Sequence, residues 1–198
     1  MNNTKKIGGR GRPRTFDRDE ALAKAQALFH LKGYDALSVA DLTAAIGINP
    51  PSFYAAFGNK AALYAEALRL YEHEAGLDVE SALAEGVPLE EGIASILQQA
   101  ADAYVSGDAK GCMVIEGARS TVDPEAGAEV RSRLEASRRF IRDRIAARGS
   151  LQAELLADYL MMAMSGLSGS ARNGLPLERL RVLAKMAADG AIQHIERK

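Results

Sequence analysis

The sequence predicts an all-α fold, with an N-terminal three-helix helix-turn-helix domain followed by a larger α-helical domain. Three observations support this prediction. Residues 38–60 contain two short helical patterns joined by a tight turn, and apolar residues recur at helical spacing along most of the remaining chain. The first third of the chain is basic although the remainder is acidic, which is typical of a protein in which one part meets phosphate groups.

The composition is that of a soluble globular protein. Of the 198 residues, 47% are hydrophobic, which is enough for a buried core. The only cysteine is Cys112, which excludes an internal disulfide framework and indicates a reducing compartment. No apolar run reaches the length of a membrane span, and the polar N-terminus does not resemble a signal peptide. We therefore expect a cytoplasmic protein without a membrane partner.

The formal net charge of −1 conceals an uneven distribution. Residues 1–60 carry nine Lys and Arg against five Asp and Glu, whereas the remainder carries 16 and 21. Residues 1–15 are rich in glycine and basic side chains, including Arg12 and Arg14, and are expected to form a flexible basic arm. Such an arm can follow DNA phosphates or enter a narrow minor groove. The alternative is a solvated tail without a partner.

Residues 38–60 have the start and stop signals of a helix pair. Ser38 can cap the first helix, Gly47 can end it, and Asn49 can cap the second. Phe53 and Phe57 are four residues apart and should face inward. Two helices joined by a short turn with a glycine form a helix-turn-helix unit, whose second helix enters the DNA major groove.

Two helices flank this unit, and the first of them completes the predicted domain, which spans residues 16–60. Asp17 should begin the first, and Gly33 should end it. After the unit, Asn59 can cap a helix whose first turn holds Lys60. A cation there opposes the helix dipole unless an anion lies nearby. A DNA phosphate would be such an anion; an exposed lysine without a role is the alternative.

The rest of the chain, residues 61–198, is expected to form a ligand-binding and dimerisation domain. The predicted helix at 151–168 is apolar on nearly all sides, so a second subunit is the simplest cover for its outer face. The final helix carries a stripe of small residues that favours close packing. The expected interface of a homodimer consists of Leu155, Tyr159, Met162, Leu180, Ala184, Ala187 and Ala191.

The same domain contains candidates for a ligand pocket. Methionine side chains adapt to varied apolar ligands, although methionines more often fill a core. Cys112 is either a packing residue or a redox or electrophile sensor, and its apolar neighbours favour packing. The candidate pocket residues are Ile96, Tyr104, Cys112, Met113, Phe140 and Met161.

Catalytic and metal chemistry find little support in the sequence. His30, His73 and His194 are isolated, without carboxylates or cysteines at metal-ligand spacing. The chain has no nucleophile elbow, phosphate loop or dinucleotide fingerprint. We expect neither an enzyme nor a cofactor or metal.

At this point the chain resembles the TetR family of bacterial transcriptional regulators, most strongly over residues 16–68. The segments that carry the resemblance are Ala27-Leu28-Phe29, Lys32-Gly33-Tyr34, Leu37-Ser38-Val39, Ile46-Gly47-Ile48 and the run from Phe53 to Leu63. That run is similar to the family's Leu/Phe-Tyr-x-x-Phe-x-x-Lys-x-x-Leu signature. The resemblance implies DNA contacts, mainly to phosphates, from Ser38, Thr43, Asn49, Ser52, Tyr54 and Lys60.

The chain departs from the family pattern at two positions of the second helix. Ala56 stands where many members have histidine, and Pro51 replaces a frequent glycine. The contacts expected from this helix are therefore weighted toward phosphates rather than bases.

Together these observations predict a homodimeric, ligand-responsive transcriptional repressor. It should bind a near-palindromic double-stranded DNA operator and leave it when a small apolar effector binds. Two alternatives remain: a regulator that senses oxidants or electrophiles through Cys112, and a ligand- or protein-interaction module whose helix-turn-helix is purely structural.

Overall fold

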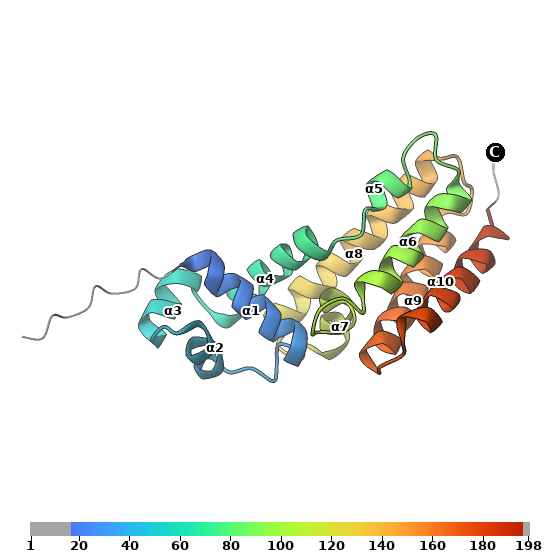
Figure 1. The fold of residues 1–198 in the computed structure, drawn as a ribbon. Helices are drawn as coiled ribbons and strands as arrows, with labels where there is room; N and C mark the ends of the chain where they lie inside the picture. The colour runs from blue at the N-terminus through green and yellow to red at the C-terminus, as the bar shows by residue number, and fades with distance from the viewer. Residues whose placement is uncertain (1–16, 196–198) are drawn as a thin grey trace, which may run out of the picture.

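The computed structural model describes residues 17–195, which form ten α-helices and no strand. The helices are α1 (Arg18–Lys32), α2 (Val39–Ile46), α3 (Pro50–Phe57), α4 (Lys60–Ala75), α5 (Val79–Ala82), α6 (Leu89–Ala103), α7 (Met113–Ser120), α8 (Pro124–Ala147), α9 (Ala153–Arg172) and α10 (Leu177–Ile192). Figure 1 shows an elongated molecule with α1–α3 at one end and the long helices α6, α8, α9 and α10 side by side at the other. The predicted all-α class is confirmed.

The caps predicted for the first helices are present. The Asp17 carboxylate accepts hydrogen bonds from the backbone N–H groups of Asp19 and Glu20, and α1 ends at Gly33 as expected. The helix predicted at 151–168 differs, because α9 starts at Ala153 and continues to Arg172. Gly169 remains helical there, and the chain turns only at Gly174.

Buried side chains form two hydrophobic clusters. The N-terminal cluster joins α1–α4 to α7 and the start of α8, with Phe29 and Tyr64 among its largest members. The body cluster lies between α6, α8, α9 and α10. Cys112 and Leu134 are partly buried and pack against both clusters. These two residues therefore lie where the two halves of the molecule meet.

The boundary predicted between residues 60 and 61 falls at the start of α4. This helix packs against α1 and also against α8, so it belongs to the N-terminal cluster while it contacts the body. Within residues 17–195, no helix combines the length and the apolar character that crossing a membrane requires.

Candidate functional site

Local hydrogen bonds define the ends of α2 and the start of α3. The Ser38 hydroxyl accepts a hydrogen bond from the Asp41 N–H (3.1 Å), and the Asp41 carboxylate accepts one from the Ser38 N–H (2.8 Å), which completes a capping box. Gly47 ends α2 with φ 83°, a left-handed conformation that glycine adopts without steric cost. Asn49 Oδ1 then accepts a hydrogen bond from the Ser52 N–H (2.9 Å) and begins α3. Ser38 and Gly47 therefore define the two ends of α2, and Asn49 defines the start of α3.

α3 has one buried and one exposed side. Phe53 and Phe57 are buried in the N-terminal cluster, as the spacing predicts. Ser52, Tyr54 and Ala55 are exposed, and the Tyr54 ring packs edge-on against Phe53 at 5.5 Å between centroids. The exposed side of α3 is thus the surface that this unit offers to a partner.

The residues predicted to contact DNA differ in their exposure to solvent. Ser38, Asn49, Ser52 and Tyr54 are exposed on the helix-turn-helix. Thr43 is not: it is 5% exposed, and its hydroxyl donates to the Ala40 carbonyl (3.0 Å). We omit Thr43 from the proposed contacts, because an inward position on α2 already satisfies its hydroxyl. Arg12 and Arg14 lie outside the described residues, together with the rest of the predicted arm.

Lys60 has partners inside the chain. Its ammonium nitrogen lies 3.8 Å from the centroid of the Tyr34 ring, which is the geometry of a cation–π contact. Partial burial lowers the pKa of Lys60, while the nearby carboxylates of Asp35 and Asp123 raise it. Because the ring and carboxylates accompany this cation at the start of α4, its position does not require a phosphate.

Arg18 joins three helices of the N-terminal domain. Its guanidinium binds both carboxylate oxygens of Glu66 on α4 (2.7 and 2.8 Å) and lies over the Phe57 ring at 4.9 Å. It also donates to the Ala56 carbonyl near the end of α3 (3.4 Å). This arginine therefore holds α3 against α1 and α4.

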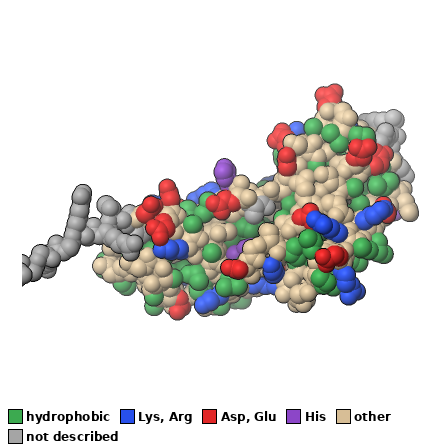
Figure 2. Space-filling model, viewed as in Figure 1, with side chains coloured by type: hydrophobic (Ala, Val, Ile, Leu, Met, Phe, Trp, Pro, Cys, Tyr) green, Lys and Arg blue, Asp and Glu red, His purple; other side chains and the backbone are tan. Residues whose placement is uncertain are grey.

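The folded part of the N-terminal domain is not basic. Residues 17–60 contain four Lys and Arg and five Asp and Glu. Figure 2 shows acidic side chains gathered over the start of α1. The excess of positive charge in the first third of the sequence therefore comes from residues 1–16.

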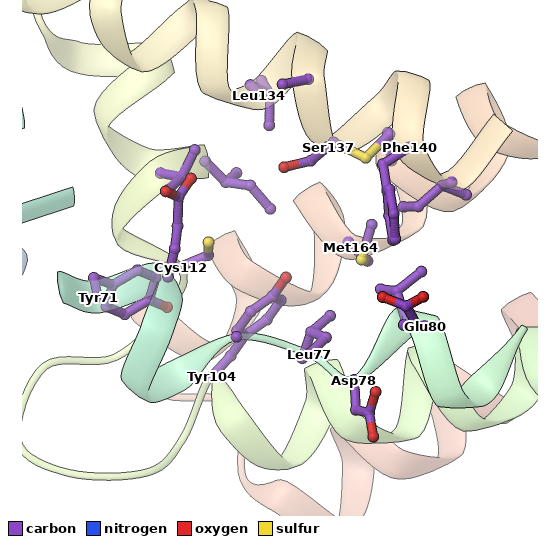
Figure 3. A pocket seen from close by; sticks show the side chains of 18 residues that line it. Tyr71, Leu77, Asp78, Glu80, Tyr104, Cys112, Leu134, Ser137, Phe140 and Met164 are labelled. Atoms are coloured by element: carbon purple, nitrogen blue, oxygen red, sulfur yellow. The ribbon is translucent and has the colours of Figure 1, made fainter. Parts of the chain in front are cut away.

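A cavity of about 610 Å³ lies in the body between α4, α5, α7, α8 and α9 (Figure 3). Four of the predicted pocket residues line it: Tyr104, Cys112, Phe140 and Met161. The other two do not. Ile96 is fully buried in the body cluster, and Met113 is buried in the N-terminal cluster. Both follow the apolar pattern of their helices, which does not distinguish a core residue from a cavity wall.

Several cavity residues were missed by the sequence analysis. Leu134 and Ile141 are apolar and seven residues apart on α8, with Ser137 between them, so helical spacing could have placed all three on one face. Tyr71 and Leu77 come from α4 and the segment after it, where the apolar pattern loosens. No signal in the sequence identifies them as cavity residues.

One end of the cavity is polar. The phenols of Tyr71 and Tyr104 and the thiol of Cys112 lie on the wall there. Burial raises the pKa of both phenols and of the thiol, so all three are neutral at pH 7. Figure 3 shows Tyr104 reaching into the space between Cys112 and Met164.

A direct contact links this end of the cavity to the helix-turn-helix domain. His30 on α1 donates from Nε2 to the carbonyl of Gly111 (2.9 Å), the residue before Cys112. The His30 ring packs edge-on against Tyr71 at 5.0 Å between centroids. From α9, Arg172 donates to the carbonyls of His30 (3.3 Å) and Leu31 (3.2 Å). The end of α1 is thus held by the wall of the cavity.

The last two helices expose apolar side chains. Together Leu155 and Met162 on α9 and Val182, Leu183 and Met186 on α10 form what we call the α9–α10 face. The most exposed are Met162 (62%) and Met186 (63%). Tyr159 lies half-buried beside them, so close to Gly190 that its hydroxyl would be 2.8 Å from a Cβ there.

Three of the residues predicted for a dimer interface are buried within the single chain. Leu180, Ala184 and Ala191 are buried within the chain, in the body cluster, and Ala187 is half-buried. The stripe of small residues on α10 packs within one subunit, because α6 lies against it. These three side chains therefore leave no surface for a second chain.

Comparisons with known proteins agree on the family. The family described as "Bacterial regulatory proteins, tetR family" matches residues 21–67. The HTH-type transcriptional repressor BdcR of Escherichia coli (strain K12) is 41% identical over 180 residues, which cover 90% of this chain and 91% of BdcR. The chain belongs to the TetR family. It is therefore a TetR-family transcriptional regulator and not an enzyme.

Other TetR-family proteins support the assignment. The HTH-type transcriptional repressor ComR of the same strain is 35% identical over 194 residues and covers 88% of this chain and 89% of ComR. A cysteine mutant of the TetR family regulator CifR has been solved with a 26-bp double-strand operator DNA. That structure matches with a TM-score of 0.79 and 35% identity, over 90% of this chain and 98% of CifR.

Proposed function

We propose that this TetR-family protein is a repressor that binds a near-palindromic double-stranded DNA operator as a homodimer. A small apolar effector in the cavity releases it from the DNA. The observation that carries the proposal is the exposed side of α3, with Ser52 and Tyr54, in a chain similar to a regulator solved with its operator. The proposed site of action is the cytoplasm, where the DNA is.

The proposed DNA contacts fall mainly on phosphates. Ser38, Asn49, Ser52 and Tyr54 carry hydroxyl or amide groups on the exposed face of the unit. Hydroxyls, amides and helix N-termini are frequent phosphate ligands. The adjacent Pro51 and Ala55 carry no hydrogen-bonding side chain, so α3 has few groups for reading bases. Arg12 and Arg14 would add the electrostatic attraction that residues 17–60 do not supply.

The α9–α10 face supports a homodimer. Its five large apolar side chains are exposed in a single chain, and a second copy of the same face would cover them. Such a dimer has two α3 helices related by a two-fold axis. Successive major grooves on one side of B-DNA are roughly 34–36 Å apart, so a palindromic operator matches this symmetry.

The link between Cys112 and His30 supports control by an effector. Cys112 lines the cavity, and Gly111 directly before it accepts the hydrogen bond from α1. An effector changes DNA affinity only if it binds the DNA-free arrangement more tightly than the DNA-bound arrangement. A bound molecule that displaced Cys112 would also move the Gly111 carbonyl, to which His30 of α1 is hydrogen-bonded. The effector would then bind the DNA-free arrangement and the DNA-bound arrangement with different affinities.

The proposal is tested with duplexes enriched from a random pool by the purified protein. Fluorescence anisotropy should give an affinity at least about a thousandfold higher for the enriched palindrome than for a scrambled duplex at physiological salt. A Tyr54→Ala, Ser52→Ala variant should lose most of that affinity while it keeps its melting temperature. Equal weak binding to both duplexes would refute the proposal and favour the interaction module with a structural helix-turn-helix.

A second candidate function is sensing of oxidants or electrophiles through Cys112. The observation in its favour is that the thiol lines the cavity, where the phenols of Tyr71 and Tyr104 also lie. Burial raises the pKa of the thiol, which lowers its reactivity. A Cys112→Ser variant separates the two functions: loss of oxidant-induced DNA release supports sensing, whereas unchanged induction supports the small effector.

A further inference from the structure

We infer that the effector is an uncharged, mainly apolar molecule with one carbonyl-type oxygen, which accepts hydrogen bonds from Tyr71 and Tyr104. This inference rests on the proposed function only in assigning the effector to the cavity. The charge of the ligand follows from the ionisable groups around the cavity, and the oxygen follows from its polar end.

The described wall of the cavity offers no cationic partner for an anion. Among the described residues that line it there is no Lys, Arg or His. Two arginines that do not line the cavity each form an ion pair with a wall carboxylate: Arg133 with Glu72, and Arg144 with Glu80. A carboxylate or phosphate in the cavity would therefore lose its hydration without gaining a counter-ion, which is strongly unfavourable.

The cavity offers no free partner for a cation either. The carboxylates of Glu72 and Glu80 are each already paired with one of the two arginines just named. The third wall carboxylate, Asp78, is exposed to solvent and caps α5 by accepting a hydrogen bond from the Ser81 N–H (3.0 Å). Figure 3 shows Asp78 directed away from the centre of the cavity. An ammonium group would thus be desolvated without a dedicated carboxylate.

The polar end presents two phenol hydroxyls that can donate hydrogen bonds to a ligand. Tyr104 is only 3% exposed, and Tyr71 is also buried. Both phenols line the cavity near Cys112, whose sulfur is a weak hydrogen-bond acceptor. A ligand oxygen would be a better acceptor for the same two hydroxyls. The remaining wall is largely apolar: Leu77 lies beside Tyr104, and Leu134 lies on the opposite side of the cavity (Figure 3).

The experiment compares four probes built on one aromatic skeleton. They are 2-acetylnaphthalene, which has the neutral acceptor; 2-ethylnaphthalene, which lacks it; 2-naphthoate, an anion; and 2-naphthylmethylammonium, a cation. Calorimetry on the full-length protein without DNA should give a dissociation constant for the ketone that is roughly tenfold or more below that of either ion. The ketone should also bind about fivefold more tightly than the hydrocarbon.

Single substitutions test whether the hydroxyls of Tyr71 and Tyr104 bind the ketone oxygen. Tyr104→Phe removes one hydroxyl and should abolish the difference between the ketone and the hydrocarbon while both still bind. Tyr71→Phe should reduce the same difference, so the test survives if one variant fails to fold. Ser137→Ala, on the opposite wall, is the matched control and should preserve it.

The outcomes separate this inference from the proposed function. Equal or tighter binding of either ion, no binding of the ketone, or an unchanged preference in both tyrosine variants overturns the inference, even if operator binding is intact. Tight binding of the ketone without release of the operator supports the ligand class and contradicts release by an effector.

Discussion

His30 Nε2 lies 2.9 Å from the carbonyl oxygen of Gly111, which places a side chain of the DNA-binding domain against the residue that precedes Cys112. The contact spans 81 positions in the sequence, so it forms only when both halves of the chain are folded. Because the carbonyl can only accept, the Nε2 nitrogen carries the proton. The contact makes the orientation of α1 depend on the cavity wall.

The protonation of His30 should make stability depend on pH. Burial and the nearby Arg172 lower its pKa below 6.5, while the Gly111 carbonyl and Glu116 act in the opposite direction. Folded His30 is therefore neutral at pH values where the unfolded chain already takes up a proton. Its contribution to stability is complete above pH 6.5 and is lost as the pH falls from 6.5 through the lowered pKa of the folded state.

Urea unfolding between about pH 5 and pH 8 checks this expectation. His30→Gln keeps an N–H for Gly111 but does not titrate, so its stability should change less over this range than that of the wild type. His73→Gln, at an exposed position on α4, is the control and should follow the wild type. Identical pH profiles for wild type and His30→Gln would contradict the prediction.

Gly111 should be more sensitive to substitution than its neighbour in the same loop. It has φ 82°, and an added Cβ would lie 3.0 Å from Ser168 Oγ and 3.1 Å from the Ser168 carbonyl. Gly111→Ala should therefore cost about 2–3 kcal/mol of unfolding free energy. Gly107 has φ 66° with nothing within 4 Å, so Gly107→Ala isolates the backbone cost of about 1 kcal/mol. Equal losses in urea unfolding would show that crowding at Ser168 is unimportant.

The sequence was informative where a residue acts on its own neighbours. Ser38, Gly47 and Asn49 determine the ends of α2 and α3 through bonds within four residues, and all three were predicted. It was less informative for side chains whose role depends on a distant helix. Leu180 has the same apolar character whether α6 or a second subunit covers it. Likewise, nothing around Lys60 in the sequence indicates that the Tyr34 ring lies beside it.

Charges placed on the α9–α10 face should dissociate the proposed dimer. Met162→Glu with Met186→Glu replaces two methionines, which are 62% and 63% exposed in one chain, by carboxylates. Sedimentation should show a monomer, because a buried, unpaired carboxylate opposes association. Val122→Glu is the control, since Val122 is 84% exposed and lies before α8, outside this face. A double variant that sediments as a dimer would place the interface elsewhere.

Removal of two arm arginines should weaken the salt dependence of operator binding. Each phosphate contact contributes roughly −0.9 to the slope of log affinity against log salt, so Arg12→Ala with Arg14→Ala should lower its magnitude by about 2. The effect should be clear because residues 17–60 contain only four Lys and Arg, against five Asp and Glu. Fluorescence anisotropy over a salt series measures the slope. Lys185→Ala, which removes an α10 lysine paired with Asp189, should leave it unchanged. An unchanged slope in the arginine variant would mean that the arm is a solvated tail, and the phosphate contacts would then have to come from the folded helix-turn-helix alone.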